Sequence, residues 1–179
     1  MMGVMRPPLA DLLDLQPHPE GGWFRQTWAS PESVSLPDGR VRPTATLIHF
    51  LLPAGEASAW HRVRSDEVWL AHRGSVRLEI GGAGAHPGSR AGARSATLGL
   101  ELDAGEQAQL VVPAGHWQRT VPGSADALVS CLVSPGFDFA DFELDDDDPS
   151  REGADDGVPR APAGPDDDPV DPSAPVNPA

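Results

Sequence analysis

Two residue types are missing from this chain of 179 residues: it contains no lysine and no tyrosine. Its 13 basic residues are therefore all arginine. The first absence excludes a lysine Schiff base and a phosphate-binding P-loop lysine. The second excludes a tyrosine as a catalytic acid or base. Any acid catalyst in this chain must be a histidine, a carboxylic acid or water.

Cysteine and long apolar runs are also scarce. Cys131 is the only cysteine, so no intrachain disulfide can form, and we expect it to be a buried, inert thiol. No stretch reaches the ~18 consecutive apolar residues of a membrane-spanning helix. The start of the chain also lacks the apolar core of a signal peptide. We therefore expect a soluble, cytoplasmic protein.

Positive charge is the third scarcity, because the net charge is −14. Nucleic acids and anionic membranes need a basic footprint, so we expect neither as a partner. The acid is unevenly spread: residues 1–144 hold 16 acidic and 11 basic side chains, whereas residues 145–179 hold 11 and 2. The second segment also has eight prolines and no aromatic residue. It cannot bury enough apolar surface to fold, so we predict a folded domain over 1–144 and a disordered acidic tail over 145–179.

Short apolar runs separated by glycine and proline make up most of the predicted domain. A short helix is expected near the start, where leucines between residues 9 and 15 lie between prolines. The remaining runs are typical of strands in an all-β sandwich or barrel. We predict strands over Thr44–Leu52, Asp66–Arg73, Ser75–Ile80, Ala108–Val112, Trp117–Val121 and Ala127–Ser134.

Two motifs carry the functional information. The first runs from Gly55 to Gly74 and reads G-x5-H-x-V-x3-E-x6-G, with His61, Val63 and Glu67 at its defined positions. The second, P-x-G-x2-Q, starts at Pro113 and ends at Gln118. They resemble the two cupin motifs, G-x5-H-x-H-x3-E-x6-G and P-x-G-x2-H. Val63 and Gln118 stand where those motifs have histidines.

Four blocks in order narrow this resemblance to the "cupin 5" subfamily, a domain of unknown function described as predicted sugar epimerases. The blocks are Pro19–Arg25, Trp60–Trp69, Val112–Gln118 and Val129–Leu144. The resemblance implies a double-stranded β-helix, the jelly-roll barrel, often assembled as a homodimer. It also implies a pocket inside the barrel for a small-molecule substrate or ligand.

A metal cupin usually holds its ion with three histidines and one carboxylate, and this chain retains only His61 and Glu67 from that set. Two ligands are few for tight binding, so we expect no cofactor. A divalent transition metal on these two residues is the alternative. Without a metal, His61 and Glu67 form an acid–base pair, with His61 as the base.

Four further residues are candidates for substrate binding. Alternation along a strand puts Trp69 on the face of Glu67, and Gln118 occupies a motif position in the pocket. His116 shares the face of Gln118 and could reach the pocket mouth. Arg25 could bind a phosphate or carboxylate through its planar guanidinium.

Three functions remain open from the sequence. The first is a metal-independent epimerase or isomerase of a carbohydrate-like substrate. The second is a binding module without turnover, favoured by the incomplete ligand set and the missing tyrosine. The third is a metal-dependent cupin enzyme.

Overall fold

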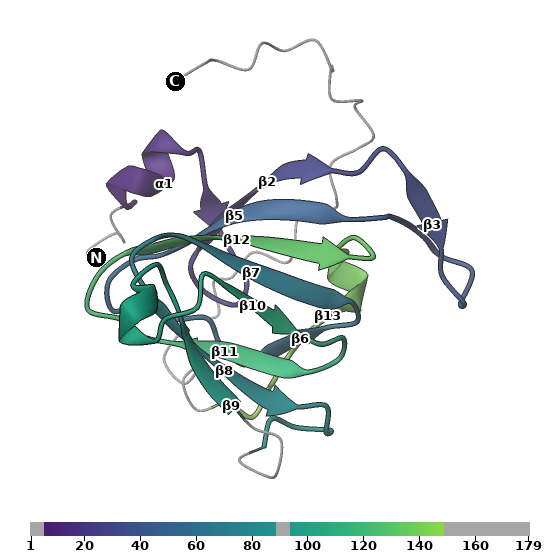
Figure 1. The fold of residues 1–179 in the computed structure, drawn as a ribbon. Helices are drawn as coiled ribbons and strands as arrows, with labels where there is room; N and C mark the ends of the chain where they lie inside the picture. Colours follow the sequence, from purple (N-terminus) through teal and green to yellow (C-terminus); the bar gives the residue numbers. More distant parts are fainter. Residues whose placement is uncertain (1–5, 89–93, 149–179) are drawn as a thin grey trace.

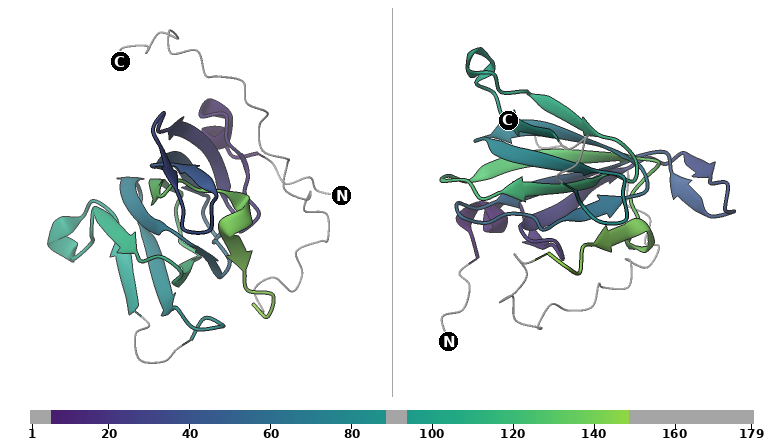
Figure 2. Two further views of the ribbon diagram at one scale, coloured as in Figure 1. Left: turned by 90° about the vertical axis from the view of Figure 1, so that its right-hand side faces the viewer. Right: turned by 90° about the horizontal axis from the view of Figure 1, so that it is seen from below.

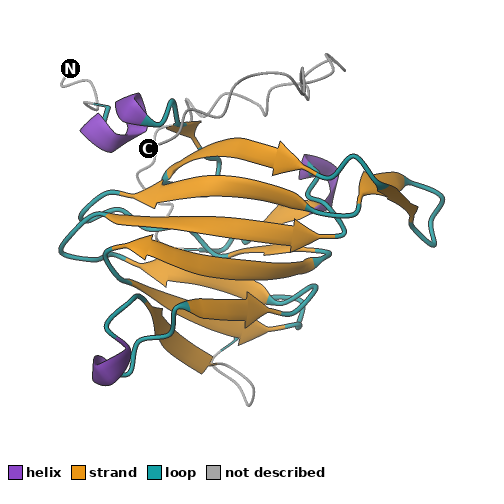
Figure 3. Ribbon diagram, turned by 45° about the horizontal axis from the view of Figure 1, so that its top comes forward, coloured by secondary structure: helices purple, strands orange, loops and turns teal. Residues whose placement is uncertain are grey.

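Strands account for almost half of the described chain, which comprises residues 6–88 and 94–148 of a computed structural model (Figure 3). The helical elements are α1 (Pro8–Leu12) and two single 3₁₀ turns, η1 (Leu102–Ala104) and η2 (Phe139–Asp141). The strands are β1 (Gln16–Pro17), β2 (Trp23–Ala29), β3 (Ser33–Ser35), β4 (Val41–Pro43), β5 (Thr46–Leu52), β6 (His61–Val63), β7 (Asp66–Arg73), β8 (Val76–Gly82), β9 (Arg94–Leu98), β10 (Gln109–Val112), β11 (Trp117–Val121), β12 (Ala127–Ser134) and β13 (Phe142–Leu144). The all-β prediction is confirmed.

Two antiparallel sheets form the body of the protein. One has six strands in the order β1-β2-β5-β12-β7-β10, and the other has five in the order β13-β6-β11-β8-β9. Figures 1 and 2 show the sheets layered on each other, with the β3–β4 hairpin projecting from one end. The consecutive strands β6 and β7 lie in different sheets. The turn between them therefore carries the chain from one wall of the barrel to the other.

All six predicted strands occur, with shifts of up to two residues at their ends. The predicted helix is present as α1, with a proline in its first turn, and it ends at Leu12. Gly74 turns the chain from β7 into β8 with a φ of 66°. A Cβ there would stand 2.2 Å from the carbonyl oxygen of Asp126, so only glycine fits this corner.

Several strands were not predicted, among them β2, β6, β9 and β13. β6 and β13 have three residues each, too few to show a period of two. β2 is longer, but five of its seven residues are exposed, so it lacks the alternation that marks a half-buried strand.

The core lies between the sheets and adjoins the cavity described below, because Phe50 and Cys131 belong to both. Phe50, Trp69, Leu78, Leu98 and Val129 are among its buried side chains. Each large apolar side chain buried here stabilises the fold by roughly 1.5–3 kcal/mol. None of the helices in the described residues is long and apolar enough to cross a membrane.

The predicted tail begins at residue 145, yet the structure describes its first four residues packed on the barrel. Asp145 and Asp148 are buried, and both bond to the backbone of Trp60 beside β6. The N–H of Asp145 and the carboxyl group of Asp148 thus satisfy the backbone carbonyl and N–H of Trp60. Residues 149–179 lie outside the described part of the chain. The domain boundary and the disorder of those residues stay predictions.

Candidate functional site

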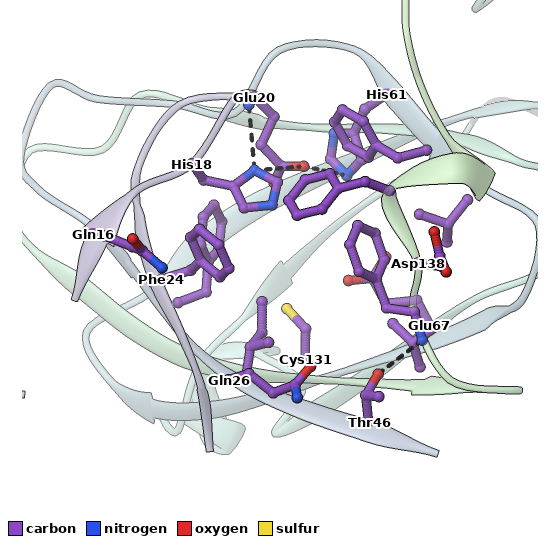
Figure 4. Close-up of a pocket in the computed structure, with 17 residues that line it drawn as sticks. Gln16, His18, Glu20, Phe24, Gln26, Thr46, His61, Glu67, Cys131 and Asp138 are labelled. Atoms are coloured by element: carbon purple, nitrogen blue, oxygen red, sulfur yellow. Dashed lines mark hydrogen bonds and ion pairs between the residues drawn. The ribbon is translucent and has the colours of Figure 1, made fainter. Parts of the chain in front are cut away.

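A cavity of about 450 Å³ opens between the two sheets (Figure 4). This volume suits a small organic ligand. Eight apolar residues line it: Phe24, Phe50, Phe137, Phe139, Phe142, Ile48, Val63 and Val133. Nine polar residues complete the wall: Gln16, His18, Glu20, Gln26, Thr46, His61, Glu67, Cys131 and Asp138. The cavity therefore combines aromatic walls with ionisable groups.

His61 and Glu67 face this cavity from opposite sheets, because β6 and β7 belong to different walls of the barrel. Both side chains are buried, with exposed fractions of 2% and 6%. The sequence predicted that they form a pair. The carboxylate that contacts His61 is a different one: Oε2 of Glu20 lies 3.2 Å from Nε2 of His61.

Glu20 lies between two histidines, since its Oε2 is also 3.5 Å from Nδ1 of His18. The turn from His18 to Gly22 after β1 holds this arrangement. The N–H of Gly21 donates to the carbonyl of His18 at 3.0 Å, and the carbonyl of Glu20 accepts from the N–H of Ala59 at 2.7 Å. We call His18, Glu20 and His61 the histidine end of the pocket. Figure 4 shows these three side chains together.

Burial keeps the two histidines neutral near pH 7. It lowers the pKa of His61 to about 4 and that of His18 to about 3. Burial, with the nearby Glu67 charge, raises the pKa of Glu20 well above its ordinary range. Nδ1 of His61 lies 2.8 Å from the carbonyl of Ala59, so that nitrogen carries the hydrogen. Nε2 is then free to accept a proton from the Glu20 carboxyl group.

Glu67 has neutral donors around it. The amide nitrogen of Gln118 donates to Oε2 of Glu67, and the Cys131 thiol also hydrogen-bonds to Glu67. Burial raises the pKa of Glu67 to about 6, and these two hydrogen bonds limit the rise. Burial raises the pKa of the Cys131 thiol well above its usual value, so the thiol is a donor. We call Glu67, Gln118 and Cys131 the carboxylate end.

A hydrogen bond from Trp69 fixes the orientation of the Gln118 side chain. Its Oε1 accepts a hydrogen bond from Nε1 of Trp69 at 2.9 Å, which turns its amide nitrogen toward Glu67. Gln118 and Trp69 are both buried, and neither lines the cavity. The structure brings these two predicted residues to Glu67 as its supports. Their predicted contact with substrate stays a prediction.

The other two predicted substrate-binding residues lie elsewhere. Arg25 is exposed on β2, whereas its neighbours Phe24 and Gln26 line the cavity, so Arg25 points to the other face of the sheet. His116 lies at the turn before β11, with Nδ1 3.2 Å from the carbonyl of Ala114. Neither residue is part of the cavity wall, so the structure does not bring them to His61 and Glu67.

Sequence reasoning missed the role of His18 and Glu20. Both lie beside or in the Pro19–Arg25 block, but their spacing matches no motif for metal binding or acid–base catalysis. The signal available was polarity within an otherwise proline- and glycine-rich turn. That signal shows a turn and does not show that the turn points into the barrel.

The usual cupin metal set does not fit this site. Val63 lines the cavity with an apolar side chain, and both polar atoms of Gln118 are bonded to Trp69 and Glu67. The chain therefore provides one histidine and one carboxylate from that pattern. We derive no step through a metal.

A separate group of potential metal ligands lies outside the pocket. Ligand atoms of His86, Asp145 and Asp147 are within 4.8 Å of one another. His86 and Asp147 are exposed. Carboxylates often gather at a surface without an ion, so we assign this group no role.

Comparison with known proteins shows which family the chain resembles. The family model described as Cupin superfamily (DUF985) matches residues 8–145. A hypothetical protein from Leishmania major is 32% identical with a TM-score of 0.68, over 76% of this chain and 84% of that one. A protein from Shewanella oneidensis is 36% identical with a TM-score of 0.66, over 76% and 82%. No curated protein matches the sequence.

More distant structures show the fold alone. Oxalate decarboxylase from Bacillus subtilis is 16% identical with a TM-score of 0.52, and the match covers 74% of this chain and 30% of that one. The jelly-roll prediction is therefore confirmed, and so is the resemblance stated from the motifs. This chain belongs to the cupin superfamily, in the family DUF985.

Proposed function

We propose that this protein is an isomerase or epimerase that moves a proton on a small carbohydrate-like molecule bound in the barrel pocket. One observation carries the proposal. The pocket holds a proton-donating group at the histidine end and a proton-accepting group at the carboxylate end. Epimerisation beside a carbonyl needs both, because one proton is removed and another is returned.

Glu67 is the base in this proposal. Its pKa of about 6 leaves it mostly ionised at pH 7, and a pKa near the working pH is favourable for a general base. His61, with a pKa of about 4, is a weaker base at the same pH. The roles therefore differ from the sequence expectation, in which His61 was the base.

Glu20 is the acid, and the neutral His61 holds its carboxyl group in place. Burial raises its pKa well above the ordinary range, which favours the protonated form, and Nε2 of His61 lies 3.2 Å from its Oε2. A carboxylic acid thus takes the part that a tyrosine cannot take in this chain. Glu67 takes up the proton of the broken C–H bond, and the electron pair of that bond forms the enolate. Glu20 then gives its proton to the carbon, and proton exchange with solvent returns both carboxyl groups to their starting states.

The test is solvent exchange. Wild-type protein in D₂O with a panel of reducing sugars and keto-sugars should place deuterium at the carbon beside the carbonyl, read by mass spectrometry. Glu67→Gln and Glu20→Gln should each lower the rate at least ~100-fold. Glu79→Gln removes a carboxylate that pairs with Arg119 outside the cavity wall, and it should leave the rate unchanged.

A binding module without turnover is the second candidate, favoured by the five phenylalanines of the wall. Ligand-dependent thermal shifts without deuterium incorporation would support it and overturn the isomerase. Near-stoichiometric iron, manganese, nickel or zinc in wild type but not in Glu67→Gln would overturn both in favour of a metal-dependent enzyme. The expected homodimer stays a prediction.

A further inference from the structure

The described residues of the cavity wall include acidic groups but no arginine. Three of the described residues that line it carry carboxyl groups: Glu20, Glu67 and Asp138. No arginine is found among the described residues that line the cavity, and the chain has no lysine. His18 and His61 are neutral near pH 7, because burial lowers the pKa of each. Among the described residues that line the cavity, none therefore offers a cationic side chain to a ligand.

Arg40 and Arg42, close to the cavity-lining Asp138, are already paired with aspartates. Arg42 on β4 is buried, and its Nη2 atom lies 3.1 Å from Oδ2 of Asp141 and 3.5 Å from Oδ2 of Asp138. Arg40 binds the other oxygen of Asp141 at 2.7 Å. These ion pairs hold the segment that carries Phe139 and Phe142 against the barrel. Their charge is neutralised within the protein and is not offered to a ligand.

Glu67 lacks a cationic partner. Its two hydrogen-bond donors, the Gln118 amide and the Cys131 thiol, are neutral. No ion pair joins Glu67 to an arginine or histidine within 4.0 Å among residues 6–88 and 94–148. A buried carboxylate without a counter-charge is costly, and a ligand cation would remove that cost.

The aromatic wall favours the same kind of ligand. Phe137, Phe139 and Phe142 pack with ring centroids 5.0 to 6.2 Å apart, and Phe24 and Phe50 line the cavity with them. The face of an aromatic ring carries negative potential and attracts ammonium groups. The rings also pack against apolar or carbohydrate-like bodies.

We propose that the pocket selects a ligand carrying an ammonium group on a compact body, with that group directed to Glu67, and excludes anionic ligands. This inference rests on the proposed function for its site and narrows the substrate class. Amino sugars and related small amines fit it. Phosphorylated sugars and sugar nucleotides do not.

The experiment compares matched probes that differ in charge. Benzylamine, benzyl alcohol and benzoate form one series, and glucosamine, glucose and glucose 6-phosphate form the other. Calorimetry at pH 7.5 should give an affinity for each ammonium probe at least tenfold above its neutral partner. The anionic probes should be the weakest. Glu67→Gln should remove the preference for ammonium, whereas the control Glu79→Gln should keep it.

Tightest binding by benzoate or glucose 6-phosphate would overturn the inference, as would an ammonium preference that survives in a folded Glu67→Gln protein. If Glu67→Gln does not fold, the order of probe affinities measured on the wild-type protein still tests the inference. A failure of this inference can be distinguished from a failure of the proposed function. Deuterium exchange into a neutral sugar with no ammonium preference would sink this inference and leave the isomerase standing, whereas ammonium-selective binding without exchange would do the reverse.

Discussion

The two ends of the pocket hold their ionisable groups in different ways. At the histidine end, Glu20 contacts two imidazoles that can share its proton. At the carboxylate end, Glu67 contacts an amide and a thiol that donate hydrogen bonds but stay neutral. The pKa of Glu20 is raised well above its ordinary range, which favours the protonated form, whereas that of Glu67 is raised only to about 6. The partners, as well as burial, set the charge of each carboxyl group.

The two ends also differ in how the chain builds them. The carboxylate end comes from the regular strands β7, β11 and β12. The histidine end depends on a turn between β1 and β2 that is tied to Ala59. Strands fix side chains rigidly, whereas a turn positions them through a few hydrogen bonds. Three of the four predictions below disturb one end each and the fourth disturbs neither, and they follow in order of expected effect.

The largest effect is expected from Gln118→Leu, which breaks the carboxylate end. It leaves the Trp69 indole N–H and the Glu67 carboxylate without their buried partner. We expect a loss of about 4 kcal/mol in the free energy of unfolding, measured in urea. Gln109→Leu changes an exposed glutamine and is the matched control, expected within ~0.5 kcal/mol of wild type. Equal losses in both variants would refute the buried network.

His61→Gln tests the histidine end through pH. The folded pKa of His61 is lowered to about 4 from its ordinary 6.5, so the unfolded chain binds this proton first as the pH falls. The free energy of unfolding therefore declines between pH 6.5 and 4, by up to about 3 kcal/mol from this residue. His61→Gln should show a flatter decline in urea melts at pH 7 and 4.5. An unchanged slope would contradict a neutral buried His61, and His116→Gln serves as the control.

Glu67→Gln tests the carboxylate end, where the pKa of the buried group is shifted upward and stability therefore changes with pH in the opposite direction. Its folded pKa is raised from 4.5 to about 6, so the folded state holds this proton longer as the pH rises. Stability from protonated Glu67 is complete below pH 4.5 and is lost by about pH 6, a change of about 2 kcal/mol. The stability of Glu67→Gln relative to wild type should rise by that amount between pH 4 and 7. A difference independent of pH would argue against this assignment.

The smallest effect is expected from Arg25→Ala, which touches neither end. Its side chain is exposed and lies on the face of β2 opposite Phe24 and Gln26. Benzylamine affinity by calorimetry should change less than twofold. A loss comparable to that of Glu67→Gln would mean that Arg25 reaches the ligand.

Much of the fold could be predicted because glycine and proline separate the long strands clearly. His61 and Glu67 were also found, since both belong to one spaced motif. Alternation placed Trp69 correctly on the face of Glu67, but two residues along a strand is a step of almost 7 Å. That step carries Trp69 from the pocket into the packed core.

The rest could not be predicted because it depends on where irregular segments fold back. His18 and Glu20 belong to a turn, and three of the five phenylalanines lie in the irregular stretch that ends in β13. Nothing in their local spacing shows that they line a cavity. The contact between His61 and Glu20 therefore depends on tertiary structure, and the hydrogen bond between the Glu20 carbonyl and the N–H of Ala59 holds it in place.

The acidic residues after β13 matter for the strand that carries His61. The N–H of Asp145 donates to the carbonyl of Trp60 at 2.9 Å, and the carboxylate of Asp148 accepts from the Trp60 N–H at 2.9 Å. Both backbone groups of the residue before His61 are thus held by a stretch that composition alone assigns to the tail. These two aspartates therefore stabilise the start of β6. A shortened chain intended for expression should end after Asp148. A stop at Leu144 would remove both hydrogen bonds to Trp60 and allow the neighbouring His61 imidazole to move.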